Sequence, residues 1–156
     1  MIFDLILAGA VKFCASFLGT LGFAIVLHAP KKAWLPASAI GGLSYVLYWA
    51  LLQVGASEAV GNFIGALIGA FLAHYCARRM RMIATVFLML SIIPLVPGLG
   101  LYRCMHYLAQ EMYAEGAAAG VMAMVSIVMI ALGLGISSYA FRVIVLRRPR
   151  KGGAAG

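Results

Sequence analysis

Four stretches of the chain are apolar over a length of about twenty residues or more, and this feature constrains the fold more than any other. They cover residues 2–27, 35–54, 59–77 and 117–141. An α-helix rises about 1.5 Å per residue and the hydrocarbon core of a bilayer is about 30 Å thick, so about twenty apolar residues cross it once. Each stretch therefore predicts one transmembrane helix.

The composition excludes a water-soluble domain. Hydrophobic residues make up 65% of the chain and charged residues 10%, whereas soluble domains are about half apolar and a quarter charged. A chain of 156 residues has too much surface for its volume to bury that apolar fraction in one core. We expect an all-α integral membrane protein, with a single transmembrane domain over residues 1–151 and a disordered tail over residues 152–156.

A fifth apolar segment, residues 82–108, is interrupted by Pro94 and Pro97, so it forms either a broken crossing or a re-entrant hairpin. Short loops rich in lysine and arginine stay in the cytoplasm. Ten of the twelve basic residues lie after the first helix, after the third helix or at the C-terminus: Lys31, Lys32, Arg78, Arg79, Arg81, Arg142, Arg147, Arg148, Arg150 and Lys151. Because they belong to such loops, the net charge of +8 does not indicate nucleic-acid binding.

The acidic residues lie at the opposite helix ends: Asp4, Glu58, Glu111 and Glu115. A re-entrant hairpin would carry the C-terminal basic cluster to the outside, against the charge rule. We therefore expect a bundle of about five transmembrane helices, the fourth broken at the Pro-x-x-Pro-Gly element. The predicted N-terminus is outside and the C-terminus is cytoplasmic, in the cytoplasmic (inner) membrane.

Small residues recur every four positions along the third helix, at Gly61, Gly65, Gly69 and Ala73. Helices in lipid associate by close packing, which small residues permit. The pattern predicts a flat face that meets another helix. Gly116 and Gly120, then Ala131 and Gly135, predict shorter faces of the same kind around the last helix.

The stretch around Pro94, Pro97 and Gly98 falls near the middle of the bilayer in this topology. The two prolines remove two backbone donors, and a half-helix that starts near Pro97 exposes N–H groups with a partial positive charge. Broken helices of this kind bind carboxylates and ions at the midplane of transporters. The alternative is a kinked helix with a packing role alone.

Two basic side chains lie outside the cytoplasmic loops. Arg103, on the second half-helix, costs about 2.5 to 3.5 kcal/mol at the bilayer centre, so it needs water, an anion or a partner unless it reaches the outer headgroups. Lys12 lies about ten residues into the first helix, where it either reaches an interface or faces a polar interior.

Other polar residues carry weaker signals. Glu58 and Asn62 stand one turn apart at the start of the third helix, where capping is the preferred interpretation and lining an outer vestibule the alternative. The three histidines and three cysteines have no metal-binding spacing, so no metal site is predicted. No paired carboxylates and no nucleophile with a base occur, so we predict neither an enzyme nor a cofactor.

Three short motifs resemble those of a known family. Pro94-Leu-Val-Pro97-Gly98 followed by Tyr102 resembles the signature of the threonine/serine exporter family. His28-Ala-Pro30-Lys31 is similar to that family's short Asn-Val-Pro-basic turn, and Ala77-Arg78-Arg79 to its basic stop after the third helix. The resemblance extends over residues 15–146 and is to a small subunit like the C-terminal membrane half. His28 and Lys12 depart from the family pattern.

The resemblance implies a secondary transporter that exports small hydroxy amino acids, or dicarboxylates such as succinate in two-component relatives. It also implies a larger membrane subunit as partner, which supplies the complementary half, or a second copy of this chain. Both substrate classes carry a carboxylate. The expected substrate pathway comprises Pro94, Pro97, Gly98, Tyr102, Arg103 and Lys12.

Two other functions fit the same residues. One is a non-transporting scaffold or assembly subunit, whose glycine face docks a partner and whose break is only a kink. The other is a homo-oligomeric channel. Flux through the chain alone would favour the channel, and flux that requires a partner would favour the exporter.

Overall fold

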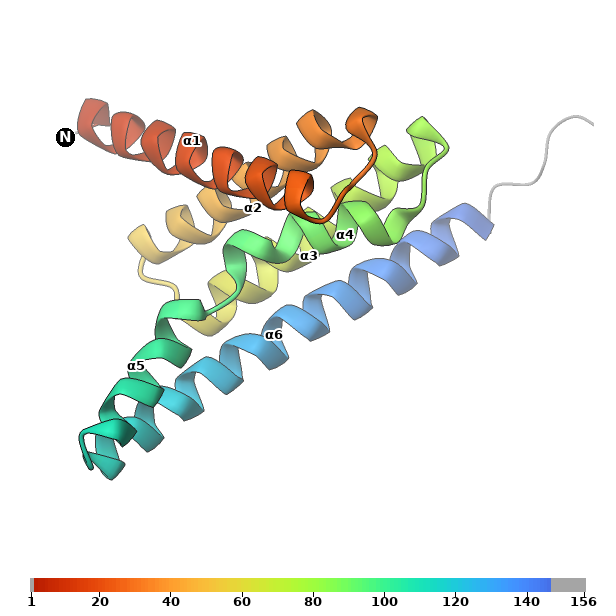
Figure 1. Ribbon diagram of the computed structural model, residues 1–156. Helices are drawn as coiled ribbons and strands as arrows, with labels where there is room; N and C mark the ends of the chain where they lie inside the picture. Colours follow the sequence, from red (N-terminus) through yellow and green to blue (C-terminus); the bar gives the residue numbers. More distant parts are fainter. Residues whose placement is uncertain (1, 147–156) are drawn as a thin grey trace, which may run out of the picture.

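The computed structural model describes residues 2–146, and all regular elements there are helical. They are α1 (Ile2–Val26), α2 (Lys31–Gln53), α3 (Glu58–Met80), α4 (Ala84–Ile92), the 3₁₀ turn η1 (Ile93–Leu95), α5 (Gly98–Ala109) and α6 (Tyr113–Leu146). The predicted tail, residues 152–156, lies outside the described residues. The helices α1 to α4 form a bundle, α6 runs along it, and α5 diverges from the bundle beside the start of α6 (Figure 1).

The predicted fold class is confirmed. The helices α1, α2, α3 and α6 are each long and apolar enough to cross a membrane. The pair Ala84–Leu95 and Gly98–Ala109 passes the same test together and is bent by 53°. The protein is thus an all-helical, multi-pass membrane protein with four to five candidate spans, one of them broken at the proline-rich element.

The helix bounds differ from the expected ones mainly at polar ends. The helix α2 starts at Lys31 rather than at residue 35, and α6 runs from Tyr113 to Leu146 rather than over residues 117–141. Hydropathy marks the part of a helix that lies in hydrocarbon, whereas the helix itself continues into the interface, where water satisfies its last backbone groups. The structure therefore extends the spans without moving them.

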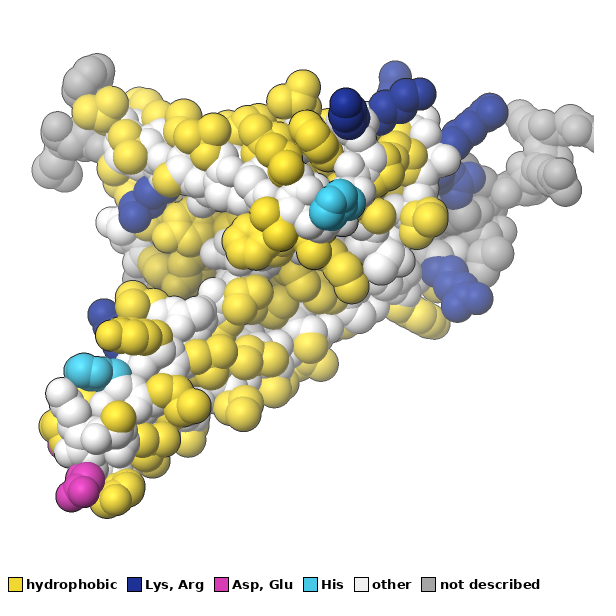
Figure 2. All heavy atoms as spheres, viewed as in Figure 1, with side chains coloured by type: hydrophobic (Ala, Val, Ile, Leu, Met, Phe, Trp, Pro, Cys, Tyr) yellow, Lys and Arg dark blue, Asp and Glu magenta, His cyan; other side chains and the backbone are white. Residues whose placement is uncertain are grey.

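Charged residues separate to opposite ends of the molecule. Lys31 and Lys32 start α2, and Arg78 and Arg79 lie in the last turn of α3. Figure 2 shows lysine and arginine side chains gathered at that end and an acidic side chain at the far tip, where α5 turns into α6. This separation is the pattern that the charge rule requires when α4 and α5 together make one crossing.

The small residues of α3 lie at its closest contacts with neighbouring helices. A Cβ atom on Gly65 would lie 3.1 Å from the backbone oxygen of Ser44 in α2, and one on Gly61 would lie 2.9 Å from the ring of Tyr48. Ala73 is fully buried in a cluster that includes Phe87 of α4. Larger side chains at these positions would force α3 away from α2 and α4.

The face of α6 that packs on α3 is not the expected one. Gly116 and Gly120 pack on α5, where Cβ atoms on them would lie 2.9 Å from the side chain of Leu108 and 3.0 Å from the Cys104 sulfur. Ala131 and Gly135 are exposed, so the prediction that they too form a packing face is wrong within this chain. Ser126, Gly133 and Ser137 are buried instead. The buried positions of α6 follow each other at alternating spacings of three and four residues, which keeps them on one side of a helix with about 3.6 residues per turn.

We predict that Gly133→Ala destabilises the protein and that Gly135→Ala does not. A Cβ atom on Gly133 would lie 2.6 Å from the backbone oxygen of Phe63, whereas nothing lies within 4 Å of one on Gly135. Overpacking costs about 1 to 3 kcal/mol, and alanine at an open helical glycine gains up to about 1 kcal/mol. Unfolding in mixed micelles, followed by tryptophan fluorescence, measures both. Equal stability of the two variants would contradict this packing.

A second prediction concerns the broken crossing. In a cysteine-free background, Arg81→Cys and Glu111→Cys should lie on opposite sides of the membrane, because the α4–α5 pair separates them. An impermeant maleimide added to intact cells should label only one of the two, and the other should react only after permeabilisation. Labelling of both from the same side would show a re-entrant hairpin instead of a crossing.

Candidate functional site at the broken helix

The break between η1 and α5 leaves backbone donors free. Pro97 precedes the first residue of α5 without a side-chain cap, and the first helical hydrogen bond runs from Leu101 N–H to the Pro97 carbonyl, at 3.1 Å. Within the described residues, the N–H groups of Leu99 and Gly100 have no backbone acceptor. The start of α5 therefore presents free donors and the positive end of a helix dipole.

Leu99 and Gly100 line a cavity of about 390 Å³, to which α2, α3, α5 and α6 contribute. The break, from Pro94 to Gly100, and Arg103 of α5 line one side. The remaining walls come from Tyr45 and Tyr48 of α2, Glu58 and Asn62 of α3, and Ser126 of α6. The cavity thus collects polar side chains that are far apart in the sequence.

Two of the lining side chains are buried and polar. Asn62 and Ser126 are each 4% exposed, and no hydrogen bond is recorded for either side chain among the described residues. Among the described side chains, the hydroxyl of Ser137 is the buried polar group without a partner, so the polar atoms of Asn62 and Ser126 keep some accessible surface. Because both residues line the cavity, these atoms are available to a polar ligand or to water held there.

Charges of both signs line the same cavity. Arg103 projects from α5 and Glu58 from the first turn of α3. In the part of the chain that the structure describes, no ion pair of 4.0 Å or less joins them. Each charge is thus free to contact a ligand.

The structure brings together most of the predicted pathway residues but not all of them. Pro94, Pro97, Gly98 and Arg103 line the cavity. Tyr102 does not: it is 64% exposed and stacks on His106, with ring centroids 5.9 Å apart. Lys12 lines a different cavity.

That second cavity has a volume of about 440 Å³ and lies between α1 and the break. Lys12 and Ser16 line it from α1, and Tyr45 and Pro94 belong to both cavities. Lys12 lies two residues from the midpoint of α1, Ile2–Val26. This separation corresponds to about 3 Å along the helix axis. Lys12 is therefore deep in the membrane.

The environment of Lys12 only partly offsets its charge. Its Nζ atom lies 5.8 Å from the ring centroid of Trp49. Such a cation–π contact contributes about 0.5 to 2 kcal/mol, whereas a lysine at the centre of a spanning helix costs about 2.5 to 3.5 kcal/mol on insertion scales. Water or an anion in the neighbouring cavity would supply the rest.

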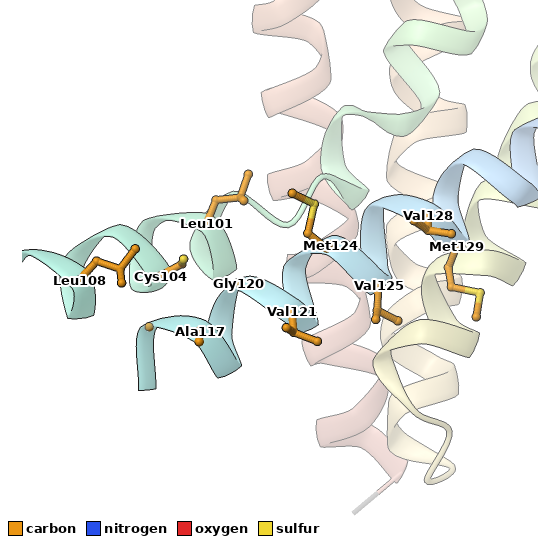
Figure 3. Close-up of a pocket in the computed structure, with 11 residues that line it drawn as sticks. Leu101, Cys104, Leu108, Ala117, Gly120, Val121, Met124, Val125, Val128 and Met129 are labelled. Atoms are coloured by element: carbon orange, nitrogen blue, oxygen red, sulfur yellow. The ribbon is translucent and has the colours of Figure 1, made fainter. Parts of the chain in front are cut away.

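A third cavity, of about 800 Å³, lies between α5 and α6 and offers no polar chemistry. Leucine, valine, methionine and small residues line it, with Cys104 the most polar among them (Figure 3). A surface of this kind suits hydrocarbon chains or another helix. We therefore place the functional site at the smaller, polar cavity beside the break.

Two lining residues show what sequence reasoning missed. The cap of α3 is Ser57, whose Oγ accepts a hydrogen bond from Val60 N–H at 3.4 Å. The preferred interpretation, capping by Glu58 or Asn62, is therefore wrong, and both residues line the cavity instead. Ser126 was not singled out at all. Its signal was a set of small residues on one face of α6, at Ala123, Ser126, Gly133 and Ser137, spaced three, seven and four residues apart.

The fold and the cavity together define the class of protein. A multi-pass helical protein with a helix broken inside the membrane, beside a cavity that holds charged groups, has the architecture of a membrane transporter. Residues 12–140 match the family model described as "Threonine/Serine exporter, ThrE", and the chain belongs to this family. Membership in a transporter family implies a role other than catalysis.

The other comparisons add little detail. A curated relative from Haemophilus influenzae, described as an uncharacterized protein, is 28% identical over 90 residues. The match covers 58% of this chain and 30% of the relative, so the chain spans well under half of that relative's length. No solved structure matches the chain. The alignment with the family thus rests on the sequence, and the geometry described above comes from this structure alone.

The backbone of the αL turn after α1 explains one departure from the family pattern. His28 has a φ of 51°, and Ala29 N–H returns to the Ala24 carbonyl at 2.9 Å. Asparagine and histidine are both enriched at positive φ among residues other than glycine. The turn therefore accepts the histidine that stands here in place of the expected asparagine.

We predict that the cavity beside the break holds water. In a cysteine-free background, Gly98→Cys should react readily with a charged thiol reagent and Gly135→Cys should not. Both glycines have open space where a Cβ atom would lie, but Gly98 lines the polar cavity and Gly135 is on the exposed surface of α6. The reactive thiolate forms in water and not in hydrocarbon. Equal reaction rates would indicate that the cavity is filled by lipid.

Proposed function

We propose that this chain is a subunit of a secondary transporter that exports small carboxylate-bearing solutes across the cytoplasmic membrane. The observation that carries the proposal is the polar cavity beside the break, where Arg103 and the free N–H groups of α5 converge with Asn62 and Ser126. A cavity of about 390 Å³ accommodates a solute of a few carbon atoms.

The carboxylate of the solute would bind at the positive side of the cavity. An arginine offers two parallel donors to a carboxylate, and the start of a helix adds free N–H groups and a partial positive charge. Arg103 and the N–H groups of Leu99 and Gly100 are positioned at this side. The site thus needs no metal to hold an anion.

The other side of the cavity distinguishes between the two substrate classes. Glu58 would attract the ammonium group of an amino acid and repel the second carboxylate of a dicarboxylate. The amide of Asn62 and the hydroxyl of Ser126 are suited to a hydroxyl group such as those of threonine and serine. The lining therefore favours a hydroxy amino acid over succinate.

The transporter would include a larger membrane subunit that supplies the complementary half. The exposed apolar face of the α5–α6 pair, where Val121 and Met122 are 63% and 70% exposed, leaves room for a neighbouring helix bundle. The alternation of basic and acidic helix ends supports an orientation in which the α1–α2 and α3–α4 turns are cytoplasmic and the N-terminus is outside. The cavity then lies toward the outer half of the membrane.

The break would also permit movement. The helices α4 and α5 meet at a bend of 53° with only Val96 and Pro97 between η1 and α5, so either half can tilt without breaking hydrogen bonds of the other. Rocking of α5 with α6 against the rest of the bundle would open the cavity to one side at a time.

We predict that Arg103→Gln lowers the apparent affinity for threonine by about 10- to 100-fold, the value of one charge-assisted hydrogen bond. The measurement is uptake of radiolabelled threonine into inverted vesicles that contain this chain and the partner subunit. Arg142→Gln is the matched control, because Arg142 is exposed at the other end of α6 and does not line the cavity.

The same vesicles test the substrate class and the competing functions. Glu58→Gln should weaken threonine transport and spare any transport of succinate. Unchanged kinetics in Arg103→Gln would count against the site, flux from this chain alone would indicate a channel, and no flux with either subunit composition would leave a scaffold.

A further inference from the structure

We propose that the Lys12 cavity is a second carboxylate-binding site, next to the first and separated from it by Tyr45 and Pro94. The proposal rests on the proposed function in one respect: the ligand is the transported carboxylate solute. It concerns a different residue, a different helix and a different cavity from those that bind the solute first.

The first argument is the position of the charge. Lys12 lies near the middle of α1, and its side chain is half-buried. In a helix that spans the bilayer, both headgroup regions are then about half a bilayer away, so the ammonium group cannot leave the membrane interior by extension alone. It requires water or an anion within the protein.

The second argument is the lack of a protein anion. Among residues 5–144, whose side chains the structure describes, no carboxylate lies within ion-pair distance of Lys12. The Lys12 ammonium group contacts the face of the Trp49 ring. This contact does not satisfy all three N–H donors of the ammonium group. The remaining donors are available to the cavity of about 440 Å³.

The third argument is the lining of this cavity. Ser16 and Tyr45 carry hydroxyl groups and line it together with Lys12, while Val11, Phe23 and Ile93 provide apolar walls. One cation, two hydroxyls and an apolar wall suit a small solute that carries a carboxylate and a short carbon chain. None of these residues carries a negative charge that would repel it.

The fourth argument is the shared wall. Tyr45 and Pro94 line both cavities, so a solute that leaves Arg103 and passes this pair arrives at Lys12. Figure 2 shows the molecule hollowed on the side between α1 and α5, where the break lies. Two cationic sites in succession would let the carboxylate exchange one positive partner for another during translocation.

The structure also provides a reporter for the test. The chain contains two tryptophans, Trp34 and Trp49, and Lys12 faces the ring of Trp49. In a Trp34→Phe background, movement of the Lys12 ammonium group toward a bound carboxylate should change the emission of Trp49. The full chain is purified into nanodiscs of phosphatidylcholine and titrated with threonine and with succinate.

We expect a saturable change in Trp49 emission with at least one of the two solutes. Lys12→Gln should weaken that binding by about tenfold or more, and Lys12→Arg should restore most of it, because the positive charge returns. Arg103→Gln should retain the response, since it removes only the first site. Lys31→Gln, which removes an exposed charge from the α1–α2 turn, should have no effect.

Equilibrium dialysis with radiolabelled solute provides a second measurement in the presence of both tryptophans. It should detect one more binding site in the parent chain than in Lys12→Gln.

Several results would overturn the proposal. The first is equal affinity for the solute in Lys12→Gln and in the parent chain, and the second is no binding of either solute at millimolar concentration. The third is a change in Trp49 emission with phosphatidylglycerol but not with the solutes, which would assign Lys12 to a lipid phosphate. The binding test can fail while the transport assay succeeds, because it measures binding and not flux. In the transport assay itself, flux that is lost in Arg103→Gln but unchanged in Lys12→Gln would contradict this inference and leave the proposed function intact.

Discussion

The structure depends on one constraint: inside a membrane, every backbone polar group must be satisfied or enclosed. Pro94 and Pro97 interrupt the fourth crossing, and the N–H groups of Leu99 and Gly100 are left without backbone acceptors. Such a break persists only where protein or water covers it. The helices α2, α3 and α6 cover one side of it, whereas Val96 and Leu99 are 51% and 63% exposed. Among the cavities described, the one at the break is where free donors, buried polar side chains and charges of both signs meet.

Close packing of α3 against α2 and α6 shapes that cavity. Gly65 lets its backbone approach Ser44 of α2, and Gly133 of α6 approaches Phe63 on another side of α3. Because these contacts involve backbone atoms, they set the distance between helices rigidly. They also fix the level of the first turns of α3, where Glu58 and Asn62 reach the cavity.

Only part of the site was predictable from the sequence. Pro94, Pro97, Gly98 and Arg103 are consecutive or nearly so, and the loss of backbone donors at a proline is a local property that any reader of the sequence can recognise. Asn62 and Ser126 had no comparable signal, because a buried polar side chain becomes noteworthy only when its neighbours are known. Ala131 and Gly135 were misassigned for the same reason: small residues mark several faces of α6, and the contact with α3 selects one of them.

The sequence by itself determined the number and approximate extent of the membrane helices, the place of the break and the separation of charges, since hydropathy, proline chemistry and charge counts act over short stretches of chain. Only the tertiary structure decided which side chains meet. It put Glu58 and Arg103 at one cavity, Lys12 at another and Tyr102 at neither. The reason is that packing against neighbouring helices sets the rotation of each helix about its axis. In a uniformly apolar helix, the pattern of residues does not predict which face is buried.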